Sequence, residues 1–146
     1  MRVMAIDYGD TRTGVAVSDA TGSIIGQSWV IIAKDAQKLA ADIAKEAKIR
    51  EVGVIVIGFP KNMDGSIGSR AEKSQMFSEF LKTFTETEIK LWDERLTTVS
   101  AHKILDSAGR FGKKRKKSID AVAASLILEN YLRFLEVEKG NQECNT

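Results

Sequence analysis

The most restrictive feature of this sequence is the apolar run VGVIVIGF at residues 52–59, in which β-branched side chains follow one another almost without interruption. A short apolar run of this kind is typical of a strand, and its lack of polar positions indicates that both faces are buried. Such strands belong to the parallel part of a sheet that helices cover on both sides. The chain is therefore expected to be an α/β protein.

The segments before this run alternate in the manner of strands. We expect strands at residues 2–7, 13–18 and 23–32, joined by turns so short that neighbouring strands must be antiparallel. Asp10 and Asp19 are expected to be ordinary turn residues. Helical spacing follows at residues 35–48, where Asp35 is placed to cap the first turn.

After the run, Ser69 and Glu72 stand in capping-box spacing and open a second helix. Its predicted buried side consists of Met76, Phe77, Phe80, Leu81 and Phe84. A short strand is expected at residues 88–94, a helix at about 97–105 and a last helix from about residue 119. A mixed five-stranded sheet, with three antiparallel strands and then parallel ones, flanked by helices, accommodates this order. This arrangement resembles the ribonuclease H-like fold.

The length of 146 residues suits one domain with a substantial core, and no linker divides the chain. We expect residues 1–138 to form this domain and residues 139–146 to be a flexible tail. No apolar stretch approaches the roughly 18 residues that indicate a membrane span, and the N-terminus lacks a signal-peptide pattern. The single cysteine, Cys144, excludes an internal disulfide and favours the cytoplasm.

A cluster of basic side chains precedes the last predicted helix. Its members are Arg110, Lys113, Lys114, Arg115, Lys116 and Lys117. The whole chain has 22 basic and 20 acidic residues, so the part outside this cluster carries net negative charge. Adjacent cations repel one another unless an anion neutralises them, which favours nucleic acid as a partner over a solvated loop between two helices.

Acidic residues fall at three places from which a sheet could direct them to one site. Asp7 ends the first strand on an otherwise apolar face, where burying a carboxylate is costly unless a charge compensates it. Asp93 and Glu94 end the last strand, and alternation alone does not decide which of them points inward. Asp120 lies in the first turn of the last helix, where a capping role is the alternative. Carboxylates gathered in this way suit Mg²⁺, and a pair of such ions can promote phosphodiester hydrolysis.

Four segments resemble, in the same order, motifs of the YqgF/RuvX family. They are DYGDTRTGVAVSD, GFPKNMDGSIGSRAE, DERLTT and KKRKKSIDAVAASLILENYL. The family is described as Holliday-junction-resolvase-like and as pre-16S rRNA nucleases, and the resemblance extends from residue 2 to about residue 135. It implies that Asp7, Glu94 and Asp120 bind Mg²⁺ or Mn²⁺ and carry the catalysis. It is this resemblance that selects Glu94 rather than Asp93.

Other basic residues are candidate phosphate contacts. Arg12 can contact a phosphate or pair with Asp10, and the residues alone leave both open. Lys61 and Arg70 stand near the start of the second helix, whose N-terminus can hold a phosphate. The alternative for this segment is a plain strand-to-helix connection.

The sequence thus predicts a metal-dependent nuclease that uses water as the nucleophile, since no serine, cysteine or histidine arrangement suits covalent catalysis. The resemblance implies processing of the 5′ end of pre-16S rRNA in ribosome biogenesis. A four-way DNA junction is the alternative substrate and would favour a symmetric dimer, so monomer and homodimer both stay open. A nucleotide-binding module like those of actin and sugar kinases, and a non-catalytic nucleic-acid-binding factor, are the remaining alternatives.

Overall fold

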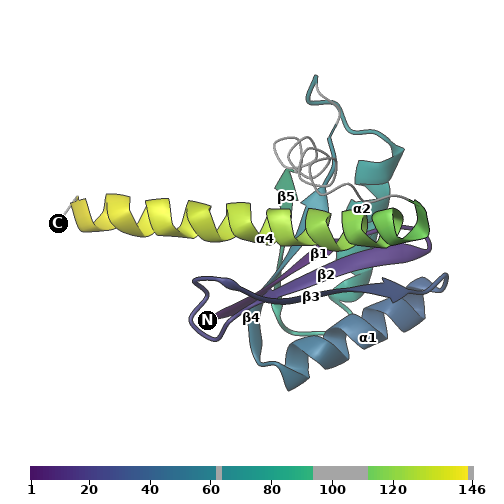
Figure 1. Ribbon diagram of the computed structural model, residues 1–146, viewed down its shortest axis with the longest axis horizontal. Helices are drawn as coiled ribbons and strands as arrows, with labels where there is room; N and C mark the ends of the chain where they lie inside the picture. The colour runs from purple at the N-terminus through teal and green to yellow at the C-terminus, as the bar shows by residue number, and fades with distance from the viewer. Residues whose placement is uncertain (62–63, 94–111, 145–146) are drawn as a thin grey trace.

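The computed structural model describes residues 1–61, 64–93 and 112–144, and within the last helix it describes the side chains of residues 122–138. These residues form a five-stranded sheet with helices on both faces (Figure 1). The strands are β1 (Arg2–Asp7), β2 (Arg12–Ser18), β3 (Ile25–Ile32), β4 (Val52–Phe59) and β5 (Glu88–Asp93). The helices are α1 (Ala36–Ile49), α2 (Ser69–Leu81) and α4 (Gly112–Cys144).

The sheet has the strand order β3-β2-β1-β4-β5. β1, β2 and β3 are antiparallel neighbours, whereas β4 is parallel to β1 and β5 is parallel to β4. This confirms the predicted mixed sheet, with its hairpin strands followed by parallel ones. The parallel strands end at one edge of the sheet, which is where open α/β sheets form their ligand sites.

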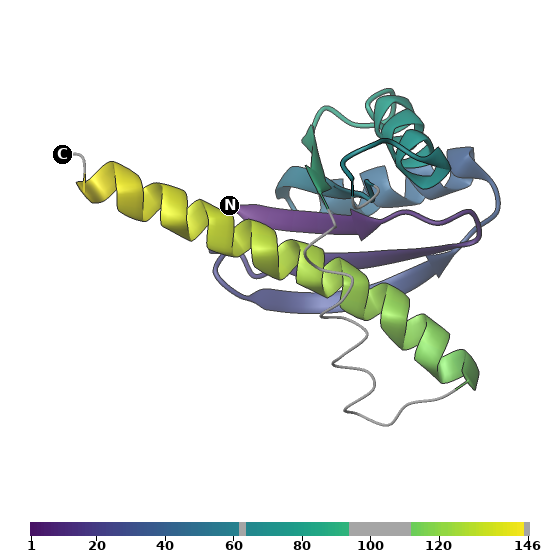
Figure 2. The same cartoon turned by 90° about the horizontal axis from the view of Figure 1, so that it is seen from above.

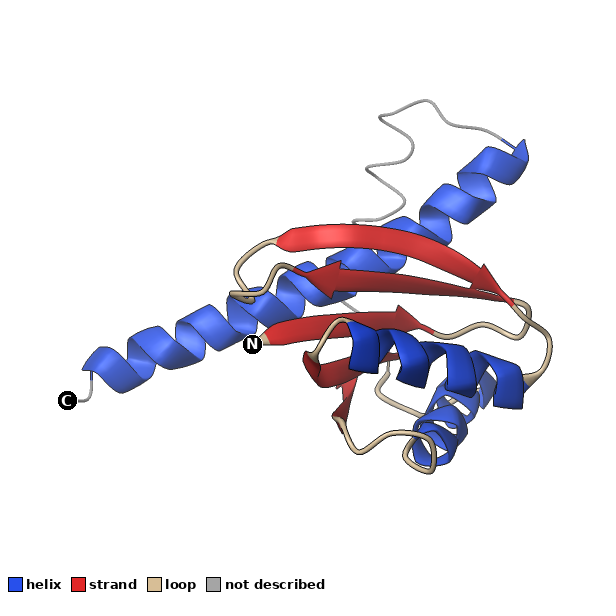
Figure 3. Ribbon diagram, turned by 90° about the horizontal axis from the view of Figure 1, so that it is seen from below, coloured by secondary structure: helices blue, strands red, loops and turns tan. Residues whose placement is uncertain are grey.

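β4 is buried on both faces, as its unbroken apolar sequence predicts. Ile55 and Ile57 pack into the cluster that contains the α1 and α2 side chains, whereas Val54 and Val56 pack against α4. Figure 3 shows the corresponding layers, with α1 and α2 on the near side of the sheet and α4 behind it. Each of these side chains contributes about 1.5–3 kcal/mol through burial, so β4 contributes substantially to the core on both faces of the sheet.

The helix starts test two of the capping predictions. Asp35 caps α1 as expected, because its carboxylate accepts a hydrogen bond from the Gln37 N–H at 2.9 Å. The capping box predicted for α2 is wrong. Gly68 occupies the cap position without a side-chain bond, and Ser69 is already the first helical residue.

The predicted buried side of α2 is also wrong in part. Phe77 and Leu81 are buried, but Met76 is 71% exposed and Phe80 is 38% exposed. The small residues Ala71, Ser74 and Ser78 are buried in their place. Small side chains allow the helix to lie close to its neighbours, and a search for large apolar residues overlooks that role.

α4 is longer than predicted at both ends. It begins at Gly112 instead of near residue 119 and continues to Cys144, past the predicted start of the tail. Its C-terminal half projects beyond the sheet in the views of Figures 1 and 2. None of the described helices is long and apolar enough to cross a membrane. The predicted helix at about residues 97–105 lies outside the described residues.

Candidate active site and nucleic-acid interface

Asp7 is the last residue of β1 and pairs with Gly14 of β2 across the antiparallel ladder. Val3 and Ala5, which precede it at alternate positions, pack in the same cluster as the α4 side chains. Because strand side chains alternate between faces, Asp7 lies on the α4 face of the sheet. It is only partly buried, so a carboxylate at this strand end can still meet a ligand.

The turn that follows Asp7 requires glycine at position 9. A Cβ added to Gly9 would collide with the backbone carbonyl oxygen of Arg12. The hydroxyl of buried Thr13 lies 3.4 Å from the Gly9 nitrogen and holds the two sides of the turn together. The absence of a side chain at Gly9 therefore permits the tight turn, and this turn sets the course of the chain directly after β1.

Helix α2 holds this turn from the other face of the sheet. The Tyr8 ring stacks on Phe77 with 4.6 Å between ring centroids, and the Lys73 ammonium lies 3.1 Å from the Asp10 carboxylate. Burial, followed by the nearby Asp10 charge, raises the pKa of Tyr8 above its ordinary value, so the phenol is neutral at physiological pH. Packing thus fixes Tyr8, and this helps to hold Asp7, which directly precedes it, at the end of β1.

β5 ends at the same edge of the sheet as β1. The ladders align Ile6 with Ile57 and Ile57 with Leu91, so Asp7 is level with Trp92 on β5, two strands away. Trp92 packs with the α4 cluster and therefore shares the face of Asp7. Asp93 alternates to the opposite face. This removes Asp93 from the face that carries Asp7, while Glu94 lies outside the described residues.

Asp120 belongs to the N-terminal part of α4, one helical turn before the buried Ala124. α4 runs roughly opposite to β1 in Figures 2 and 3, so its N-terminal half lies toward the side on which β1 ends. Of the predicted metal ligands, Asp7 alone has a described side chain. Within the described part of the chain, no three acidic, histidine or cysteine side chains gather into a metal-binding group.

Arg12, at the start of β2, was predicted either to contact a phosphate or to pair with Asp10. Its predicted alternative partner, Asp10, is instead paired with Lys73. Arg12 is half-buried and makes no ion pair with the described residues. Lys61 follows β4 and lies 5.6 Å from the centre of the Phe59 ring, and Arg70 is exposed in the first turn of α2.

The basic cluster is placed on a helix and not in a loop. Lys113, Lys114, Arg115, Lys116 and Lys117 fall in the first turns of α4, whereas Arg110 lies outside the described residues. The N-terminus of a helix already carries partial positive charge, so cations there are unfavourable without an anion. This position strengthens the electrostatic reason to expect a polyanion.

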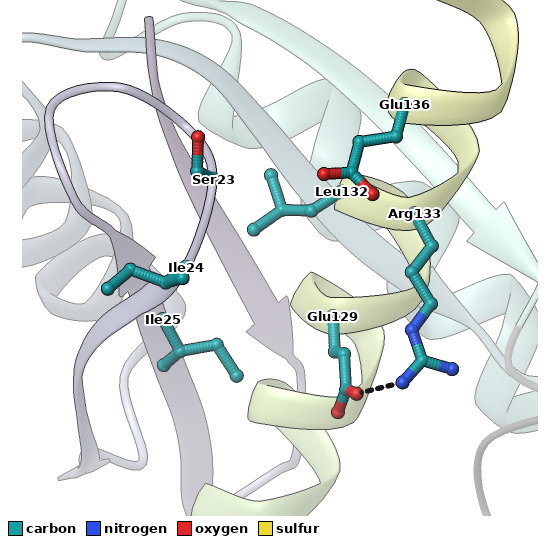
Figure 4. Close-up of a pocket in the computed structure, with 7 residues that line it drawn as sticks. All are labelled: Ser23, Ile24, Ile25, Glu129, Leu132, Arg133 and Glu136. Atoms are coloured by element: carbon teal, nitrogen blue, oxygen red, sulfur yellow. Dashed lines mark hydrogen bonds and ion pairs between the residues drawn. The ribbon is translucent and has the colours of Figure 1, made fainter. Parts of the chain in front are cut away.

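A pocket of about 330 Å³ lies at the other end of the sheet (Figure 4). It lies between the β2–β3 turn and α4, and its polar lining includes Glu129 and Arg133, which form an ion pair at 2.6 Å. The Met1 ammonium lies 3.2 Å from the carbonyl oxygen of Ala20 in the same turn, so this end is the start of β1. The pocket is therefore remote from Asp7 and is not part of the candidate active site.

Comparison with known proteins decides the family. The sequence profile of the RuvX family, described as a Holliday junction resolvase, matches residues 1–134. The chain belongs to the RuvX family. The match covers the strand that ends at Asp7, the β4–α2 connection, the end of β5 and the larger part of α4.

Curated relatives of this RuvX chain are similar over nearly their whole length. A protein of Halothermothrix orenii with the name "Putative pre-16S rRNA nuclease" is 48% identical over 134 residues, covering 92% of this chain and 96% of the relative. A protein of Halalkalibacterium halodurans with the same name is 45% identical and covers 90% of this chain and 96% of the relative.

Solved structures support the fold of the RuvX chain. The fowlpox virus resolvase bound to Holliday junction DNA superposes with a TM-score of 0.58 at 13% identity, covering 92% of this chain and 99% of that one. Thermus thermophilus RuvC bound to its junction substrate gives a TM-score of 0.56 at 12% identity, with coverage of 92% and 96%. At these identities the comparison establishes the shared ribonuclease H-like fold.

The sequence alone did not predict the contacts that hold the turn after β1 in place. Lys73 and Asp10 are 63 positions apart, and Tyr8 and Phe77 are similarly distant, so no local pattern signals either pair. Asp10 was expected to be an ordinary turn residue, and its ion pair with α2 corrects that interpretation. Asp19, in contrast, is a turn residue as predicted, because its carboxylate accepts hydrogen bonds from the Thr21 hydroxyl and the Ser23 N–H.

Proposed function

We propose that this RuvX chain is a metal-dependent nuclease that hydrolyses phosphodiester bonds at the 5′ end of pre-16S rRNA. The relatives that match nearly the whole chain carry the corresponding name. Catalysis is assigned to Asp7, Glu94 and Asp120, within a domain of residues 1–138, and the reaction to the cytoplasm. Water is the nucleophile.

The observation that carries this proposal is the placement of Asp7. The carboxylate lies at the carboxyl end of a parallel strand, on the α4 face, and β5 ends at the same edge two strands away. β5 leads into the acidic motif, and α4 runs roughly opposite to β1, so its N-terminal half lies toward the side on which β1 ends. A rigid sheet therefore offers one acid, and two neighbouring elements can bring the others.

The residues assigned as ligands offer carboxylate oxygens, which are the donors that Mg²⁺ and Mn²⁺ prefer. Bound there, such an ion supplies Lewis-acid chemistry that favours deprotonation of the attacking water and neutralises charge on the departing oxygen. The chain's own part is to hold Asp7 at a fixed strand end and to keep Asp93 on the other face. Arg12, which makes no ion pair with the described residues, is available to hold a phosphate at this edge.

Binding is assigned to the cations outside the carboxylate site. Arg12, Lys61 and Arg70 contact phosphates near the cleavage point. Arg110, together with Lys113, Lys114, Arg115, Lys116 and Lys117, holds the backbone of the nucleic acid at the start of α4. These contacts are independent of base sequence and weaken as salt rises.

The deciding experiment compares wild type, Asp7→Asn and the control Asp35→Asn on a pre-16S rRNA fragment and on a four-way DNA junction. Asp35→Asn removes one carboxylate charge as well, but keeps a cap acceptor for α1. We expect cleavage of the RNA by wild type with Mg²⁺ or Mn²⁺ and none with chelator. Asp7→Asn should lower the rate about a hundred-fold or more, which corresponds to losing about 2.7 kcal/mol or more of transition-state stabilisation.

The other outcomes assign the alternatives. Cleavage of the junction alone would make the chain a junction resolvase, which the family description favours as the second candidate. RNA binding without any cleavage by wild type would identify a non-catalytic binding factor. Cleavage that survives both Asp7→Asn and the chelator would contradict the proposed chemistry.

A further inference from the structure

A group of aromatic side chains lies on the α4 face of the sheet, beyond the candidate active site. Trp92 of β5 meets Tyr131 and Phe134 of α4 in edge-to-face contacts, with 5.4 Å between ring centroids in each pair. Tyr131 is buried and joins α4 to the sheet. Phe134 is 44% exposed, so much of its ring is accessible to a ligand.

A cation accompanies these rings. Lys90 precedes Trp92 by two positions and shares its face, and the Lys90 ammonium lies 5.9 Å from the centre of the Tyr131 ring. Interaction with Tyr131 first, and with Glu88 second, raises the pKa of Lys90 above its ordinary value. The side chain is 47% exposed and its contact with Glu88 is long, at 3.8 Å, so the charge is accessible to a further anion.

Trp92 connects this group to the predicted cleavage site. Trp92 is level with Asp7 in the parallel ladders, with Gly58 of β4 between them. Two strand spacings separate the Asp7 and Trp92 backbones by about 10 Å. That is a span of one to a few nucleotides of single-stranded nucleic acid.

We infer that Trp92, Phe134 and Lys90 form a binding site for an unpaired nucleotide of the substrate RNA. The base stacks on the exposed Phe134 ring beside Trp92, and the adjoining phosphate meets the Lys90 ammonium. This inference rests on the proposed function and deepens it, because it makes a single-stranded segment next to the cut a determinant of substrate choice. Aromatic rings beside a cation are the combination that single-stranded nucleic acids use for binding.

The test measures binding of a single-stranded RNA of about ten nucleotides, with and without abasic positions, at low salt and in chelator. Phe134→Leu keeps an apolar side chain and removes the aromatic ring. We expect it to weaken binding of the base-bearing RNA about ten-fold and to leave binding of the abasic RNA nearly unchanged. Phe134→Tyr, which retains a ring, should bind like wild type.

Phe80→Leu is the matched control. Phe80 is 38% exposed and also forms an edge-to-face pair, with Phe84, but α2 lies on the opposite side of the sheet. It should bind like wild type. Thermal unfolding of each variant verifies that the fold is retained.

Fluorescence gives a readout independent of affinity and turnover. The chain has two tryptophans, and Trp29 lies on β3 beneath the Arg50 guanidinium. In a Trp29→Phe background, emission from Trp92 should be quenched by base-bearing RNA and not by abasic RNA. Equal quenching by both, or equal affinities of Phe134→Leu and Phe80→Leu, would overturn the inference while leaving the nuclease proposal intact. Failure of wild type to bind either RNA would also overturn the inference, whereas the nuclease proposal is decided by the cleavage experiment.

Discussion

Gly9 and Asp19 illustrate how much one residue determines in a turn. Gly9 lets the chain reverse directly after Asp7, because no side chain fits against the Arg12 carbonyl. Asp19 organises the next turn through its carboxylate, which accepts hydrogen bonds from the Thr21 hydroxyl and the backbone of Ser23. Both residue types were recognisable as turn residues in the sequence, but the atoms they meet were not.

Gly9→Ala is expected to destabilise the protein by about 1–3 kcal/mol, since the added methyl group forces the backbone apart. It should also lower nuclease activity because Asp7 is displaced. The control is Gly26→Ala, where the nearest atom would be 3.3 Å from the new Cβ and a small adjustment suffices. Denaturant unfolding measures both, and equal effects of the two substitutions would contradict the proposed constraint.

Asp19→Ala is expected to destabilise the folded state at neutral pH. Hydrogen bonds, first from Thr21 and then from Ser23, lower the pKa of Asp19 below 3.8. The ionised form is therefore stabilised by folding, and this contribution is present above the unfolded value and is lost as pH falls through the folded value. The stability difference between wild type and Asp19→Ala should shrink in strong acid. A difference that grows there would contradict this reasoning.

At the scale of elements, α2 determines the position of the turn after β1. It does so through the Tyr8–Phe77 stack and the Lys73–Asp10 ion pair. The two contacts differ in burial, because Phe77 is 3% exposed while the ion pair is largely in solvent. The packing of Phe77 should therefore contribute more to the free energy of unfolding than the Lys73–Asp10 ion pair does.

Phe77→Ala is expected to cost about 3–5 kcal/mol of unfolding free energy, because it leaves a cavity against Tyr8 and the core. Lys73→Met should change the unfolding free energy by less than about 1 kcal/mol, because exposed ion pairs contribute little. Denaturant unfolding of both variants gives the comparison. A larger loss for Lys73→Met would mean that charge, not packing, holds the turn.

At the scale of the whole molecule, the two faces of the sheet carry different groups. The carboxylate of Asp7 lies at one edge of the sheet, and the cationic residues 113–117 open the long helix that packs across it. α1, α2 and their side chains lie on the other face. The α4 face thus carries the groups to which we assign catalysis and nucleic-acid binding.

Replacing Lys113, Lys114 and Lys116 together by Gln should lower the salt dependence of RNA binding. Each lost phosphate contact reduces the slope of log affinity against log salt by nearly one, so a change of about two to three is expected. The matched control replaces Lys38, Lys45 and Lys48, which are exposed on α1. An equal change in both variants would indicate attraction by total charge instead of a located contact.

Much of the fold was predictable from the sequence because it rests on local periodicity. The bounds of β1 and β4, the cap at Asp35 and the burial of β4 on both faces were predicted correctly. The start of α4 was predicted wrongly. In the sequence a run of cations resembles a loop, and only the packing of the rest of the helix shows that these residues belong to it. Glu94 was selected by resemblance, and this choice stays a prediction because Glu94 lies outside the described residues, although alternation places Asp93 on the face opposite Asp7.

By itself the sequence determined where strands and helices form, since the backbone imposes periods of two and 3.6 residues that apolar side chains reveal. Only the tertiary structure decided that β1 lies between β2 and β4, that Asp7 is level with Trp92, and that Lys73 meets Asp10 across 63 positions. Such relations depend on which surfaces bury one another most completely. That competition involves the whole chain at once, so no single segment encodes it.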